Sequence, residues 1–237
     1  MLETLRLLQF GSGGWGDELA SGLFVTLLLA ASALPLGLMA GLALAFATNG
    51  RRRWLSEAAA AFAVTFRGIP ELLALFLVYL GGQRILTLSF GALGLAPAIE
   101  FSNFLAGAVT LGLVFAAYAS EVFLGILRTL ERSSLEAARA LGIGRYPTIR
   151  FIVLPELFRL GLPGLSNLWL STIKQSALVS VIGCEELLRK SYFAASSSGH
   201  QILFFSIVCV IYGAITTVSE VTLARIDRHL SRGRVHG

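Results

Sequence analysis

Residues 136–155 read EAARALGIGRYPTIRFIVLP, and this stretch carries the strongest local pattern in the chain. Its alanines and leucine favour helix, and Gly142 can adopt the left-handed backbone that ends one. Ser133 and Glu136 have the spacing of a capping box, in which the carboxylate also complements the positive end of the helix dipole. We therefore expect a short helix over about 133–142, followed by a basic loop and a hydrophobic segment.

This expected helix has only about two or three turns, which is marginal in water unless it packs against another surface. The small side chains of Ala137 and Ala138, together with Leu141, would fit a groove on a partner protein. An amphipathic connector lying on a membrane surface explains the helical pattern equally well. The pattern of this segment alone leaves both interpretations open.

The composition indicates a membrane protein. The chain has 237 residues, of which 55% are hydrophobic and 14% are charged, whereas soluble domains carry about 25% charge. Its net charge of +5 comes from basic residues that separate long apolar runs, so the positive-inside rule explains them better than nucleic-acid binding does. The N-terminal residues lack the pattern of a cleaved signal peptide, and we expect the first membrane helix to direct insertion.

The apolar runs predict an all-α membrane protein with five transmembrane helices in a single membrane domain over 1–237. None of the runs shows the alternation of membrane strands. In the first run, Gly37 and Gly41 offer a small face for close helix contact. We expect a break near Arg67 and Pro70 in the second run, and another near Pro163 in the fourth. The five spans are expected at about 22–47, 57–83, 104–127, 158–183 and 201–226.

Lysine and arginine predict the orientation of these spans, because they concentrate in cytoplasmic loops. Thirteen of them fall on one side of the expected membrane and four on the other. The N-terminus is therefore expected outside, in the periplasm, and the C-terminus in the cytoplasm. The same count places residues 136–142 in the cytoplasm. The basic side comprises segments 49–54, 128–159 and 225–237, and the other side comprises 1–20, 81–100 and 185–200.

Ionisable side chains inside membrane segments are costly and normally face a bundle interior or a wet cavity. Arg67 and Glu71 are four residues apart and would share a helix face if the turn at Pro70 stays helical. They form either an internal ion pair at a helix break or part of a substrate path. Glu71 after Pro70 would suit the ammonium or guanidinium group of a cationic substrate.

Three further polar residues lie in the expected spans. Glu121 either lines a path or is a structural acid paired with a backbone group or with Lys174. Lys174 and Gln175 follow the interrupted part of the fourth run, where irregular backbone is tolerated only around a cavity or inside the protein. Glu220, near the cytoplasmic end of the last run, is expected to have a packing or interfacial role.

Catalytic motifs are absent from the sequence. The chain has no G-x-x-x-x-G-K-[ST] motif, so any ATP that drives it must be hydrolysed by another subunit. It also lacks an HExxH motif, a metal-spaced His/Cys set and a nucleophile elbow. We expect a non-catalytic chain with no cofactor or metal of its own.

The spacing EAA, three residues, Gly142, nine residues, Ile152-x-Leu154-Pro155 resembles the signature loop of bacterial ATP-binding-cassette importer permeases. Three other stretches resemble the polar amino acid branch of that family, which includes histidine, lysine, arginine, ornithine and opine permeases. The resemblance spans most of the chain from the first expected helix to the last. The three stretches are RGIPELL at 67–73, AYASEVFLG at 117–125 and KQSALVSVIG at 174–183.

The resemblance implies a type I importer permease fold in the bacterial inner membrane and a homo- or heterodimer of permease subunits. The implied partners are an ATPase dimer, which holds ATP and Mg²⁺, and an external amino-acid-binding protein. The implied substrate is a polar, basic amino acid or an opine. The residues expected to touch the ATPase are Ser133, Glu136, Ala137, Ala138, Leu141 and Gly142, and those expected to touch the substrate are Arg67, Glu71, Glu121, Lys174 and Gln175.

Two positions depart from the family pattern, because Leu124 stands where relatives often have arginine and Gln175 where they often have an acid. Both departures affect the expected ligand rather than the fold. An ion- or proton-coupled carrier that works without an ATPase, with Glu71, Glu121 and Lys174 as a proton relay, is the alternative function. It would not need the cytoplasmic loop.

Overall fold

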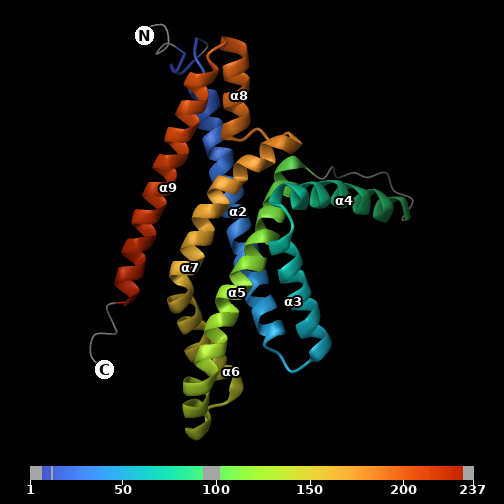
Figure 1. Cartoon of the computed structure of the whole chain (residues 1–237), viewed down its shortest axis with the longest axis vertical. Helices are drawn as coiled ribbons and strands as arrows, with labels where there is room; N and C mark the ends of the chain where they lie inside the picture. Colours follow the sequence, from blue (N-terminus) through green and yellow to red (C-terminus); the bar gives the residue numbers. More distant parts are fainter. Residues whose placement is uncertain (1–6, 12, 93–101, 232–237) are drawn as a thin grey trace. The chain divides into compact units, whose positions relative to one another are not determined.

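The computed structural model describes residues 7–11, 13–92 and 102–231, and this part of the chain folds into helices and turns (Figure 1). Residue contacts divide the chain into two compact units. The first unit comprises residues 1–33, 70–111 and 171–217, and the second comprises 34–69, 112–170 and 218–237. The helical elements are α2 (Gly16–Thr48), α3 (Arg53–Gly68), α4 (Glu71–Ala92), α5 (Asn103–Ala140), α6 (Arg145–Thr148), the π-helical turn η1 (Ile149–Val153), α7 (Leu154–Gln175), the 3-10 helix η2 (Ser176–Ile182), α8 (Leu187–Ser198) and α9 (Gln201–Ser231).

The first unit has two apolar clusters. One joins α2, α4, the start of α5 and η2 through buried side chains such as Leu29, Leu75 and Val179. The other joins the starts of α2 and α9 to α8, which lie together in Figure 1, and Leu187 and Phe204 are fully buried there. Glycine ends two elements of this unit, since Gly183 after η2 and Gly199 after α8 both have positive φ.

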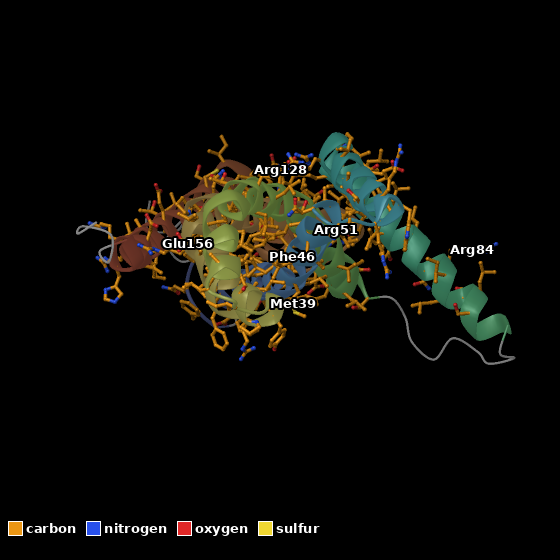
Figure 2. The ribbon with its side chains drawn as sticks, turned by 90° about the horizontal axis from the view of Figure 1, so that it is seen from below. Met39, Phe46, Arg51, Arg84, Arg128 and Glu156 are labelled. Carbon is orange, nitrogen blue, oxygen red and sulfur yellow. The ribbon has the colours of Figure 1, made fainter. Side chains whose placement is uncertain are left out.

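The second unit packs the later part of α2 against α5 and α7. Its core contains Phe115, Phe123 and Leu157, which are at most 2% exposed. Phe46 of α2, labelled in Figure 2, packs against the same cluster. α3 lies beside the end of α2 in Figure 1, where the Ser56 hydroxyl donates a hydrogen bond to the Thr48 carbonyl.

The expected small-residue contact at Gly37 and Gly41 is confirmed inside this unit. A Cβ at Gly37 would lie 2.6 Å from Phe115 Cδ1, and one at Gly41 would lie 2.9 Å from Ala119 Cβ. Both distances are too short for a real Cβ. The two glycines therefore let α2 approach α5 closely.

Replacing Gly41 by leucine is expected to lower stability by about 1–3 kcal/mol, because the added side chain forces α2 away from the α5 backbone. Thermal unfolding in lipid nanodiscs measures the change. Gly125→Leu is the matched control in the same unit, since a Cβ at Gly125 meets no atom within 4 Å. Equal unfolding temperatures for the two variants would contradict the close packing at Gly41.

Four helices of the described part are long and apolar enough to cross a membrane by length and composition: Gly16–Thr48, Glu71–Ser89, Asn103–Leu130 and Gln201–His229. The expected second span, 57–83, is instead two helices. α3 ends at Gly68, and the extended backbone of Ile69 separates it from α4, so the break expected beside Pro70 is confirmed. Its physical cause is proline, which disfavours helical backbone in the residue before it.

The expected fourth span, 158–183, also differs from the structure. α7 runs without interruption through Pro163, so the expected break there is wrong. The helix instead changes character at Ser176, where η2 begins. α7 carries Glu156, Arg159 and Lys174 and does not count among the four most apolar helices.

The prediction of a separate short helix over 133–142 is wrong. α5 continues from Asn103 to Ala140, because residues 126–141 contain no glycine or proline that would stop it. A capping residue has non-helical backbone, whereas the backbone of Ser133 lies within the helix, so no helix begins at Ser133.

Candidate functional site

The candidate path residues form two polar pairs, one within each unit. In the second unit, Arg67 Nη2 lies 3.0 Å from Glu121 Oε1, and Arg67 Nε also donates to the Ala63 carbonyl. The side chains of Arg67 and Glu121 are 31% and 45% exposed. Arg67 is thus held at the end of α3 by its own helix and by α5.

The expected ion pair between Arg67 and Glu71 is replaced by this one. Ile69 has φ −90° and ψ 146°, so the two residues do not share a continuous helix. The spacing of four residues therefore does not place the two side chains on one helix face. Within the second unit, the observed side-chain partner of Glu121 is Arg67.

The second pair lies in the first unit. Gln175 Nε2, at the end of α7, donates a hydrogen bond of 2.5 Å to Glu71 Oε1, at the start of α4. Both side chains are partly buried. The Gln175 amide is neutral, and it bonds one of the two carboxyl oxygens of Glu71. Glu71 therefore keeps an oxygen that can accept from a cationic group.

We expect the Arg67–Glu121 pair to contribute modestly to stability, because both side chains are partly exposed. A cycle of Arg67→Gln, Glu121→Gln and the double variant should show a coupling of about 0.5–1 kcal/mol. Thermal unfolding in nanodiscs measures it. Strictly additive losses would mean that the two charges do not interact.

The segment after α5 forms a well-defined turn. Gly142 has φ +70°, and the Ile143 amide donates to the Ala138 carbonyl across 2.9 Å. This is the Schellman arrangement, in which a left-handed residue turns the chain and satisfies a terminal carbonyl of the helix. The expected left-handed conformation of Gly142 is confirmed. A Cβ there would meet no atom within 4 Å, so only the backbone conformation requires glycine.

Around this turn, the chain exposes large apolar side chains. Leu141, Tyr146 and Phe151 are 77%, 72% and 70% exposed. Ala138, in contrast, is buried. The side chains of Ser133, Glu136 and Ala137 lie outside the described part of the structure. The apolar surface around the turn, defined by Leu141, Tyr146 and Phe151, is called the loop surface below.

Sequence reasoning missed a buried carboxylate in the first unit. Glu186 is fully buried and precedes α8, where its side chain accepts hydrogen bonds from the amides of Leu188 and Arg189. The hydroxyls of Thr26 and Tyr212 also donate to it. Burial raises the pKa of Glu186, and these four hydrogen bonds oppose the rise. The sequence signal was weak, because Glu186 falls in the expected outer loop 185–200.

An ion network lies close by in the same unit. Lys190 Nζ lies 2.7 Å from Glu18 Oε2 and 2.9 Å from Glu185 Oε2. The hydrogen bond from Lys190 lowers the pKa of Glu185, and the two carboxylates raise the pKa of Lys190. The network ties the start of α2 to α8.

The family model for binding-protein-dependent transport system inner membrane components matches residues 33–232. The octopine transport system permease protein OccQ of Rhizobium meliloti is 35% identical, over 97% of this chain and 98% of its own. The histidine/lysine/arginine/ornithine transport system permease protein HisQ of Salmonella typhimurium is 33% identical, over 93% and 96%.

A solved structure supports the same conclusion. A chain from the crystal structure of an amino acid ABC transporter with histidines aligns with a TM-score of 0.77 and 27% identity, over 91% of this chain and 95% of that one. A chain of the MetNI methionine ABC transporter in an inward-facing conformation shares the fold, with a TM-score of 0.67 at 19% identity.

The fold and its relatives thus define a helical permease of the inner membrane. The chain belongs to the family of binding-protein-dependent transport system inner membrane components, as the resemblance of residues 136–155 indicated.

Proposed function

We propose that this chain is the transmembrane subunit of an ATP-driven importer for a basic amino acid or an opine, and that the loop surface receives force from a separate ATPase. The observation that carries the coupling role is the Gly142 turn, beside which Leu141, Tyr146 and Phe151 are exposed. Large apolar side chains exposed together on a protein mark an interaction site. Since the sequence has no phosphate-binding loop, ATP and Mg²⁺ belong to the partner.

We place the N-terminus in the periplasm and the C-terminus in the cytoplasm, with α7 as a fifth span beside the four most apolar helices. The distribution of lysine and arginine supports this orientation. α7 is long enough, at 22 residues, to cross a hydrocarbon core. Its polar residues would then face protein or a wet path rather than lipid.

The substrate class is inferred from two observations. The named relatives transport octopine or histidine, lysine, arginine and ornithine, all of which combine a carboxylate with a cationic group. The chain offers matching groups, since Glu71 and Glu121 could accept from an ammonium or guanidinium group. Arg67 and Lys174 could bind a carboxylate, and Gln175 would orient Glu71. An external binding protein would deliver the substrate, and a second permease subunit would complete the path.

Uptake into reconstituted vesicles tests this function. Vesicles that contain the permease, its ATPase and the binding protein should accumulate arginine, lysine, histidine or octopine. They should do so only when ATP is present on the side of the membrane that the ATPase faces. Omitting the ATPase should abolish uptake. Preferential uptake of glutamate would overturn the substrate class.

The same vesicles separate the proposed function from the ion- or proton-coupled carrier. Such a carrier would respond to a proton gradient with the permease alone. The family and structural matches give no support to that alternative. Uptake driven by a proton gradient without the ATPase would restore it.

A further inference from the structure

The second unit contains an apolar groove to which the proposed transport function assigns no role. It is formed by α2, α7 and α9 and has a volume of 410 Å³. Its lining is almost entirely hydrocarbon. The residues that define it for the following argument are Leu38, Arg159, Leu162, Ser166, Trp169 and Leu223.

Arg159 makes this groove different from an ordinary apolar surface. Its Nη2 is buried and has no hydrogen-bond partner among the described residues. Glu156, labelled in Figure 2, lies 3.8 Å from Nη1, which is an ion pair but too long for a hydrogen bond. A buried guanidinium nitrogen without a partner is unfavourable, so an acceptor on a ligand would be stabilised there.

The dimensions of the groove fit one leaflet of a bilayer. From Arg159 to Trp169, its lining on α7 extends over ten residues, which corresponds to about 15 Å of helix at 1.5 Å per residue. Half of the hydrocarbon core is about 15 Å thick. A headgroup at Arg159 with an acyl chain lying towards Trp169 therefore stays within one leaflet.

We propose that this groove binds an anionic phospholipid, with an acyl chain between α2 and α7 and a phosphate oxygen accepting from Arg159 Nη2. Basic pockets between transmembrane helices bind such headgroups on the cytoplasmic side, where anionic lipids concentrate. The charged groups of a zwitterionic amino acid would find few partners in so apolar a lining. Apolar surfaces of this kind also do not hold ordered water. The choice of the cytoplasmic leaflet rests on the orientation proposed above, whereas the binding itself does not.

Native mass spectrometry of the purified permease assembly tests the proposal. Phosphatidylglycerol and phosphatidylcholine with identical acyl chains are added in steps. Wild-type protein should retain phosphatidylglycerol in preference, by about fivefold or more. Arg159→Gln should weaken phosphatidylglycerol binding by about tenfold and leave phosphatidylcholine unchanged, because it removes the charge-assisted hydrogen bond.

Three further variants separate the groove from general surface charge. Arg150→Gln removes an equal charge from an exposed position outside the groove and should bind like wild type. Arg159→Lys keeps the charge without the guanidinium and should be intermediate. Leu162→Trp fills the groove and should reduce both lipids.

Thermal unfolding in phosphatidylcholine nanodiscs verifies that each variant is folded. If Arg159→Gln does not fold, the lipid binding of Arg159→Lys and Leu162→Trp tests the proposal instead. Equal loss in the Arg159→Gln and Arg150→Gln variants would overturn the proposal. Equal binding of the two lipids by wild type would do the same. The proposal would also be overturned if a second permease subunit covered the groove. The assembly would then be free of lipid, and the Leu162→Cys variant would cross-link between subunits. None of these results depends on transport, so a failure of the proposed function remains distinguishable.

Discussion

Replacing Gly142 by valine is expected to reduce ATP-dependent uptake by roughly tenfold while leaving the permease inserted in the membrane. A β-branched residue at φ +70° is disfavoured by about 1–2 kcal/mol, so the turn after α5 relaxes to another conformation. The loop surface would then no longer be presented in the position that the ATPase contacts. Substrate-stimulated ATP hydrolysis should fall together with uptake.

Gly144→Val is the matched control for this prediction. It adds the same side chain two residues away, at a glycine that lacks positive φ, where a Cβ would be 3.7 Å from Pro147 Cδ. We expect Gly144→Val to retain most uptake. Unchanged uptake and ATP hydrolysis in Gly142→Val would refute the mechanical role of the turn.

The second large effect is expected at Glu186. Glu186→Ala removes the acceptor of two amide and two hydroxyl hydrogen bonds within a fully buried site. Donors left without a partner cost about 1–3 kcal/mol each when buried, and some of them would find water. We expect a loss of about 3 kcal/mol, which corresponds to a fall in melting temperature of about 6–12 °C for a chain of this length.

Two controls bracket this prediction. Glu185→Ala removes the neighbouring carboxylate, which is exposed and bonds only Lys190 among the described residues, and should cost less than about 1 kcal/mol. Glu186→Gln keeps the shape and one acceptor and should retain most of the stability. Equal melting temperatures for Glu186→Ala and Glu185→Ala would show that the buried network contributes little.

The Glu186 carboxyl also predicts a pH dependence of stability. Burial raises its pKa above the ordinary glutamate value of 4.5, so the folded state holds this proton to a higher pH than the unfolded state. Its contribution to stability is therefore complete below pH 4.5 and decreases as the pH rises through the raised value. Glu186→Gln, which cannot titrate, should lose this part of the pH dependence. A melting temperature that responds to pH in the same way in wild type and Glu186→Gln would contradict this assignment.

The Arg67–Pro70 segment shows where sequence reasoning succeeds and where it stops. Proline acts on the residue before it, so the break between α3 and α4 could be placed from the sequence. The partners of Arg67 and Glu71 could not. Glu121 and Gln175 are 54 and 104 residues away from the groups they bond, and no local pattern fixes such pairings.

The coupling segment shows a different limit. Its closing turn was predictable, since Gly142 alone tolerates the left-handed conformation at that place. The start of its helix was not, because a capping-box spacing competes with uninterrupted helix propagation, and no local breaker between residues 126 and 141 stops α5. Where a capping signal competes with a helix that has already formed on its N-terminal side, the existing helix continues.

The sequence by itself determined the class of protein, its all-helical and strongly apolar character and the left-handed turn at Gly142. Each follows from composition or from the backbone freedom of single residues, which are local properties. Only the tertiary structure decided the Arg67–Glu121 and Gln175–Glu71 pairs, the burial of Glu186 and the unpaired guanidinium nitrogen of Arg159. These depend on which helices pack together, because burial and hydrogen-bond partners belong to pairs of distant segments.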